Sequence, residues 1–159
     1  MHLAAEDGTV LAHLHECGKL AYALRDLGGR PLLGVDLVSG KAFGRPRFQV
    51  TDADGQPIGE VHAYGRIHHT RLLEIRAGSG ALRLTRTALL GKTWLVRDSS
   101  GGEVGRVTVS IVRSFDGLQG YRVDLDRQAG SEQRRLVVAA AVCLQVIRRW
   151  RSDPRGGPA

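Results

Sequence analysis

An internal repeat is the feature of this sequence that most constrains its fold. Residues 48–61 align without a gap on residues 94–107, and both segments follow the pattern aromatic-x-Val-x-Asp-x-x-Gly-x-x-aliphatic-Gly. A weaker copy at residues 22–32 keeps the aromatic residue, the Asp, the Gly and the aliphatic position. A repeated local pattern predicts a repeated structural unit, so we expect three copies of one unit along the chain.

The spacing of Asp and Gly in this unit is typical of a β-hairpin. An Asp at the first turn position binds backbone N–H groups with its side chain, and a Gly at the fourth position accepts a left-handed backbone. The turn Asp52-Ala53-Asp54-Gly55 also resembles the start of a calcium loop, but the third carboxylate, the correctly spaced Gly and the closing Glu are missing. We therefore predict structural turns.

Strands with one buried face follow each turn. After Gly105, period-2 spacing places Val107, Val109 and Ile111 on one face of a strand. The same alternation predicts Val61 and Ala63 inward, and Tyr121, Val123 and Leu125 inward. Residues 72–75 and 82–84 flank a Gly-Ser-Gly turn and indicate another hairpin. We expect roughly nine to twelve strands in an antiparallel meander that closes into a barrel or a tight sandwich.

The last part of the chain predicts one helix, at about residues 132–150. Ser131 is the expected N-cap, arginines fill the last turn, and Pro154 stops the chain. Residues 136–147 are apolar on every side except at Gln145. These twelve residues span roughly 18 Å, which is too short for a bilayer core of about 30 Å. We therefore predict a buried helix, thin enough at Ala139–Ala141 to be enclosed by the sheet.

Size and composition indicate one globular domain. The chain has 159 residues, of which 42% are hydrophobic and 25% charged. We expect residues 1–19 to form an N-terminal segment that can supply a first strand, residues 20–151 to form the barrel with its central helix, and residues 152–159 to form a flexible tail. The distant Cys17 and Cys143 indicate no disulfide framework. The start of the chain lacks an apolar run, so we expect no signal peptide and a cytoplasmic protein.

Basic residues are concentrated in the middle of the chain. The net charge is +7 and the sequence pI is near 10.2. Residues 65–92 hold six basic side chains against one acidic side chain, Glu74. We predict that this stretch forms a basic edge that binds anions through Arg66, Arg71, Arg83, Arg86 and Lys92. The alternative is an arginine-rich surface that is merely solvated.

The repeat and the terminal helix together resemble the LURP-one-related and phospholipid scramblase-like proteins of the tubby C-terminal-like superfamily. The resemblance covers roughly residues 20–150 and is carried by residues 48–59, 73–75, 94–105 and 135–147. It implies a closed antiparallel barrel of about twelve strands around a central hydrophobic helix. For the tubby relatives it implies binding of phosphoinositide headgroups, and for scramblases a link to phospholipid membranes. Helices of these relatives often carry an acidic residue near the end, where this chain has Gln145.

No catalytic or cofactor motif is present in the sequence. Nucleophile-elbow, P-loop, dinucleotide and zinc-protease patterns are missing, so we predict neither an enzyme nor a bound cofactor. An enzyme with its site in the barrel mouth is the third alternative, and it requires a concave pocket with converging titratable groups. His13, His15 and Cys17 would point the same way from one strand, as metal ligands do, but no fourth ligand lies nearby in the sequence and a polar strand is the preferred interpretation. His68 and His69 are interpreted as part of a basic loop.

These observations favour a non-enzymatic binding module. Its expected partner is an anionic phospholipid headgroup, which would place the protein at the inner face of a membrane, or another protein. Nucleic acid is the alternative partner, but only eight aromatic residues are present and the repeat assigns most of them to the core. The natural ligand and the oligomeric state are not predicted.

Overall fold

A computed structural model of the chain describes residues 2–4, 9–18, 21–39, 45–66, 69–78, 80–88, 92–110 and 120–152. These residues form eleven strands and one helix. The elements are β1 (His2–Ala4), β2 (Val10–Gly18), β3 (Ala21–Asp26), β4 (Pro31–Ser39), β5 (Arg47–Thr51), β6 (Pro57–Arg66), β7 (His69–Ala77), β8 (Gly80–Arg86), β9 (Thr93–Arg97), β10 (Glu103–Ser110), β11 (Gly120–Leu125) and α1 (Ser131–Ser152). The mainly β fold with a single C-terminal helix is confirmed.

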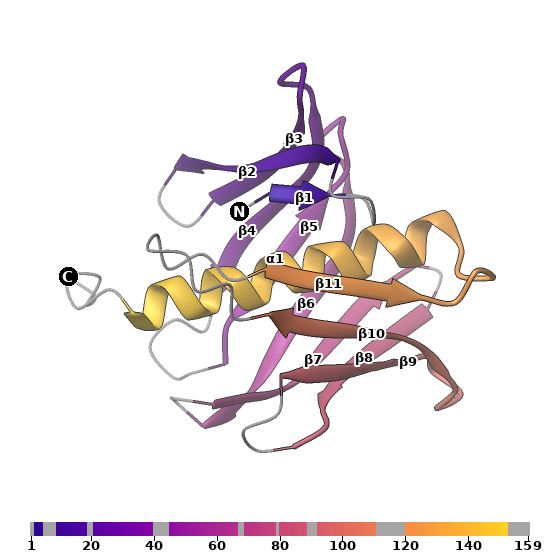
Figure 1. The fold of residues 1–159 in the computed structure, drawn as a ribbon. Coiled ribbons are helices and arrows are strands. Elements are labelled where there is room, and N and C mark those ends of the chain that lie inside the picture. Colours follow the sequence, from indigo (N-terminus) through magenta and orange to yellow (C-terminus); the bar gives the residue numbers. More distant parts are fainter. Residues whose placement is uncertain are drawn as a thin grey trace.

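The strands form one antiparallel sheet in which each strand pairs with its neighbours in sequence. The sheet curls around α1, which lies against β4 to β7 and β11 (Figure 1). The predicted closed barrel of about twelve strands is wrong, because the described sheet has eleven strands and its edges, β1 and β11, do not pair. Closure needs the first and last strands to form a ladder. The first strand, β1, has three residues, so it offers few backbone groups for one.

The three predicted turns are confirmed, and all three lie at the same end of the sheet, which we call the turn end. They connect β3 to β4, β5 to β6, and β9 to β10. In the turn at Asp52, Oδ1 of the Asp accepts hydrogen bonds from the backbone N–H groups of Asp54 and Gln56, at 3.0 and 2.9 Å. The fourth residue of each turn has a positive φ, 82° at Gly29, 79° at Gly55 and 89° at Gly101. Glycine is favoured there because a Cβ penalises this conformation.

The second glycine of the repeat serves close packing. A Cβ at Gly59 would lie 2.7 Å from the carbonyl oxygen of Arg76 and 3.1 Å from Cδ2 of Leu136 on the helix. A Cβ at Gly105 would overlap the backbone of Asp124 on the neighbouring strand. Both strong copies of the repeat therefore need glycine where adjacent backbone approaches closely.

Burial alternates along the strands as the period-2 pattern predicts. Val61 and Ala63 on β6 are buried, whereas His62 and Tyr64 between and after them face outward. Trp94 and Val107 are also buried, as expected. Partial burial is found for Val109, Tyr121, Val123 and Leu125. Ile111 lies outside the described residues.

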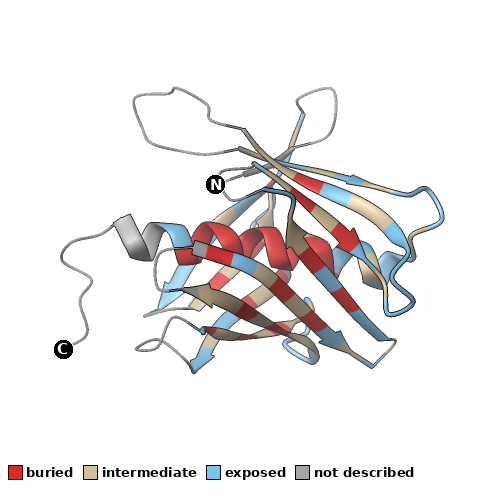
Figure 2. Cartoon of the chain, turned by 90° about the horizontal axis from the view of Figure 1, so that it is seen from below, coloured by how far each residue is buried: buried red, intermediate tan, exposed pale blue. Residues whose placement is uncertain are grey.

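The helix fills the interior of the curved sheet. From Leu136 to Ile147 every residue except Val138 is buried (Figure 2). The prediction that the sheet buries an apolar helix is thus confirmed, although the sheet around the helix is not closed into a barrel. Burial raises the pKa of the Cys143 thiol well above its ordinary value. None of the helical residues that the structure describes forms a segment long and apolar enough to cross a membrane.

The start of the helix differs from the expected cap. The backbone carbonyl of Gly130 accepts the N–H of Arg134 at 3.0 Å, and the Gly130 N–H donates to Oε1 of Gln133 at 3.2 Å. Gly130, not Ser131, therefore occupies the N-cap position, because Gln133 reaches back from the third helical position to satisfy its backbone N–H. The helix ends at Ser152, and residues 153–159 of the expected tail lie outside the described residues.

The N-terminal segment contributes more than expected. Residues 1–19 hold two strands, β1 and β2, that belong to the same sheet as the rest. Ala12 on β2 is fully buried and Leu3 on β1 packs against the core. This segment is therefore part of the domain, because its apolar side chains extend the buried face of the sheet.

Candidate functional site

The meander topology gathers basic residues at one end of the sheet. In an antiparallel meander, alternate connections lie at opposite ends, so the connections from β4 to β5, β6 to β7 and β8 to β9 share the end opposite the turn end. We call this the basic end. It holds four of the residues predicted to bind anions, Arg66, Arg71, Arg86 and Lys92, within two residues of a strand terminus. Arg71 and Lys92 have exposed side chains, and Arg86 is partly buried.

The helix adds a further basic residue to this end. α1 begins after β11 at the turn end and runs back along the sheet, so its last turn reaches the basic end (Figure 1). Burial raises the pKa of Tyr121, the second residue of β11, to about 12, and the charge of Arg148 lowers it in part. That coupling places Arg148 near the start of β11. Arg148 and Arg45, which precedes β5, were not among the predicted binding residues.

One predicted binding residue lies elsewhere. Arg83 is in the middle of β8, and its Nη2 is 3.4 Å from Oε1 of Glu74. It therefore belongs to an ion pair on the outer face of the sheet, three residues away from the basic end. The side chains of Arg66 and His69, and the whole of His68, lie outside the described residues.

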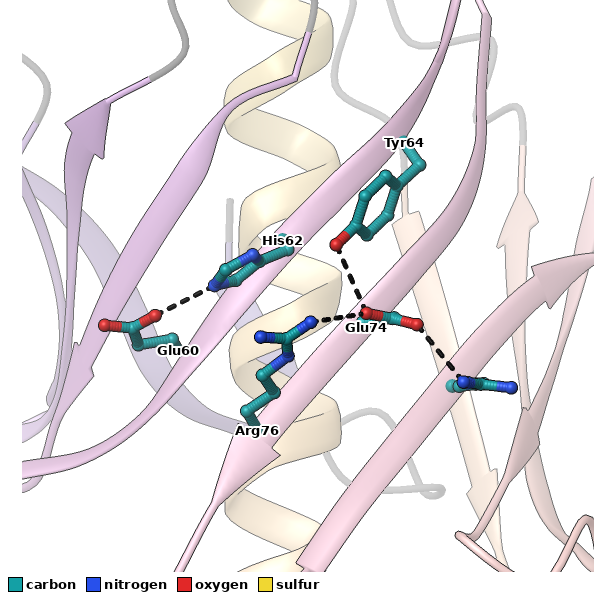
Figure 3. Close-up of polar contacts among 6 residues, drawn as sticks. Glu60, His62, Tyr64, Glu74 and Arg76 are labelled. Carbon is teal, nitrogen blue, oxygen red and sulfur yellow. Dashed lines mark hydrogen bonds and ion pairs between the residues drawn. The ribbon is translucent and has the colours of Figure 1, made fainter.

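Arg83 lies on the outer face of the sheet because it belongs to a polar cluster around Glu74 (Figure 3). Glu74 accepts hydrogen bonds from the Tyr64 hydroxyl and from Nη2 of Arg76, both at 3.2 Å, on its Oε2 atom. Burial alone would raise the pKa of Glu74, but these two hydrogen bonds and the charge of Arg83 outweigh it, so the pKa lies below its ordinary value. The carboxylate of the basic stretch is thus already paired with two arginines.

A second contact lies beside this cluster. Nε2 of His62 is 2.8 Å from Oε2 of Glu60, and the His62 ring stacks near that of Tyr64 with centroids 6.5 Å apart. The hydrogen bond with His62 is the main reason that the pKa of Glu60 is lowered, with further help from the charges of Arg47 and Arg76. The outer face of β6 and β7 is therefore a mixed surface in which each of the two carboxylates has a partner.

The basic end differs from this mixed surface. On β6 to β9, the described residues at that end include no acidic side chain, and the nearest one, Glu74, is paired away from it. Among the described residues, Glu16 on β2 and Asp36 on β4 are the acidic residues that approach the same end. A local excess of arginine and lysine can hold an anion with several oxygen atoms, such as a phosphate, by charge-assisted hydrogen bonds.

The histidines and the cysteine of β2 lie as their spacing predicts. His13, His15 and Cys17 are exposed on one face of the strand, and the two imidazole rings have centroids 6.5 Å apart. The Cys17 thiol donates to the carbonyl oxygen of His15 at 3.9 Å. Within the described parts of the chain, no three His, Cys, Asp or Glu side chains are grouped closely enough to hold a metal ion.

Sequence reasoning missed Arg45 and Arg148 because both are distant in sequence from residues 65–92. The position of Arg148 could have been predicted from the length of the link between β11 and α1. The helix follows β11 after a five-residue link, and so short a link forces the helix to run back toward the end where β11 began. For Arg45, the regular alternation of turns would have predicted the same end.

Comparison with family models, with curated proteins and with solved structures gives no match. The resemblance to the tubby C-terminal-like superfamily therefore stays a prediction that rests on the repeat and on the enclosed helix.

Proposed function

We propose that this protein is a non-enzymatic binding module that holds the phosphate of an anionic phospholipid headgroup at its basic end. The observation that carries the proposal is the convergence of Arg45, Arg66, Arg71, Arg86, Lys92 and Arg148 on that end from separate elements. Resemblance to the tubby C-terminal-like superfamily supports the same ligand class, and we infer membership of that superfamily as part of the proposal. The protein would then be peripheral at the inner face of a membrane.

Physical chemistry favours a membrane surface as the source of the phosphate. Basic side chains near an anionic bilayer contribute about 1 kcal/mol each, and the attraction falls off within about 8 Å at physiological salt. An end with several cations therefore gains more from a surface of many phosphates than from one free phosphate. The basic residues reach this end from several separate elements, and the side chains of Arg45, Arg71 and Lys92 among them are exposed.

Vesicle sedimentation tests this proposal. The protein is mixed with vesicles of phosphatidylcholine alone or with added phosphatidylserine or phosphatidylinositol phosphate. The test variant is Arg71→Gln/Lys92→Gln, whose parent side chains are exposed. The matched control is Arg97→Gln/Arg127→Gln, which removes two exposed charges at the turn end. At about 1 kcal/mol per residue, the test variant should bind anionic vesicles roughly 30-fold more weakly, and the control should bind like the parent.

Three outcomes would contradict the proposal. Equal binding to neutral and anionic vesicles would remove the role of charge, and equal losses in both variants would remove the role of the basic end. Retention of a DNA duplex in a gel shift without any vesicle binding would favour a nucleic-acid partner instead.

A further inference from the structure

The turn end holds a cavity that the proposed function does not use. Its volume is about 460 Å³, within the range of roughly 300–1,000 Å³ that is usual for small-molecule sites. It lies between the first turns of α1, the strands β1, β3 and β4, and the turn from β5 to β6. The apolar part of its lining consists of Leu3, Leu24, Leu32, Leu33, Ala53 and Val138.

The lining is suited to an aliphatic chain. The six apolar residues are all aliphatic, and Leu32 remains 41% exposed although its neighbour Leu33 is buried. A chain seated against Leu32 would remove this side chain from water, which is favourable in proportion to the apolar area covered.

Charged residues at the cavity differ in whether they have partners. Nε and Nη2 of Arg134 donate to the carbonyl oxygens of Ala129 and Arg127, at 2.9 and 3.0 Å. Oδ1 of Asp52 is occupied by two backbone N–H groups of its own turn. By contrast, the guanidinium of the adjacent Arg135 has no hydrogen bond or ion pair within the described residues. Its donors are therefore available to a ligand.

The electrostatic surroundings favour an anionic head over a cationic one. Arg134, Arg135 and the positive pole of the helix N-terminus lie on the helix side of the cavity. On the other side, Asp52 shares its charge with backbone donors, and Asp54 is an exposed residue at the tip of the turn, where water screens it. A planar carboxylate matches the fork of guanidinium N–H donors.

From this geometry we propose that the cavity binds a single-chain aliphatic carboxylate, with the chain between Leu32, Leu33 and Val138 and the carboxylate on Arg135. This site is distinct from the basic end, since the two lie at opposite ends of the sheet. It provides a second ligand class for the protein and does not depend on the proposed phospholipid binding.

Calorimetric titration with octanoate, butanoate and octanol tests the proposal. Octanoate should bind at one site. Butanoate should bind roughly 200-fold more weakly, because each buried methylene changes affinity about fourfold. Octanol should bind at least tenfold more weakly than octanoate, because it lacks the charge that Arg135 recognises.

Variants then locate the site. Arg135→Gln should reduce the affinity for octanoate about tenfold and leave octanol unchanged, whereas Asp54→Asn should strengthen octanoate binding. Leu32→Trp, at a position that is already partly exposed, should fill the cavity and weaken both ligands. Arg127→Gln is the matched control, since this exposed side chain does not line the cavity. Melting temperatures of all variants verify that they are folded.

Several results would overturn the proposal. These are no saturable binding of octanoate, equal affinity for octanol and octanoate, or unchanged binding by folded Leu32→Trp. A loss in Arg127→Gln equal to that in Arg135→Gln would show attraction to the net charge of the protein instead. The Arg71→Gln/Lys92→Gln variant separates the two proposals, because it should bind octanoate like the parent whether or not it binds vesicles.

Discussion

Replacing Gln145 by methionine should stabilise the protein. Gln145 lies on α1 inside the curved sheet with 3% of its surface exposed, and its Oε1 accepts no hydrogen bond from the described residues. A buried polar group without a partner costs about 1–3 kcal/mol, and methionine has a similar shape without that polar group. We therefore expect Gln145→Met to increase the free energy of unfolding by about 1–3 kcal/mol.

The expected increase can be measured by thermal unfolding. For a chain of 159 residues, 1 kcal/mol corresponds to about 3 °C in Tm, so Gln145→Met should raise Tm by roughly 3–9 °C. Gln145→Glu should lower Tm, and more strongly as the pH rises, because ionisation of a buried carboxylate is unfavourable. Gln128→Met, at an exposed position, is the control and should leave Tm nearly unchanged. A lower Tm for Gln145→Met would refute the reasoning, since it would mean that the amide oxygen is stabilised in the folded protein.

Three further predictions concern other parts of the fold. Glu74→Gln should lower the free energy of unfolding by about 0.5–1 kcal/mol at pH 7. Because the folded pKa of Glu74 is depressed, this difference should shrink as the pH falls below 4.5, and a constant difference in denaturant titrations would contradict the ion-pair account. Gly59→Ala should destabilise the fold by about 1–3 kcal/mol, whereas Gly78→Ala, where a Cβ meets nothing within 4 Å, should have a small effect in the same assay. A thiol reagent should label exposed Cys17 in the native protein and buried Cys143 only after unfolding, and rapid labelling of both would exclude an enclosed helix.

The local structure was largely predictable from short patterns. The Asp and Gly of each repeat define a turn through contacts within five residues, so the turns at Asp26, Asp52 and Asp98 follow from the sequence. Period-2 alternation likewise identified the buried faces of β6 and β10. These features depend on backbone conformation and on burial of one strand face, which neighbouring residues decide.

Closure of the sheet and capping of the helix were predicted wrongly. A strand pattern does not state whether the first and last strands meet, because that depends on the accumulated curvature of the whole sheet around α1. The N-cap is Gly130, whose carbonyl oxygen accepts the N–H of Arg134 and whose own N–H donates to the side chain of Gln133.

The sequence by itself determined the hairpins, the buried helix and the excess of arginine in residues 65–92, since these follow from nearest neighbours and composition. Tertiary structure decided which charges act together. Pairing of β7 with β8 brought Arg83 to Glu74, while the return of α1 along the sheet brought Arg148 near Tyr121 at the start of β11. The cavity beside Leu32 also exists only in three dimensions, because its walls come from strands and a helix more than one hundred residues apart. Whether two charges interact and whether several side chains enclose a cavity both depend on distances between residues. For residues that are far apart in sequence, these distances are defined only when the strands have paired and the helix has packed against them.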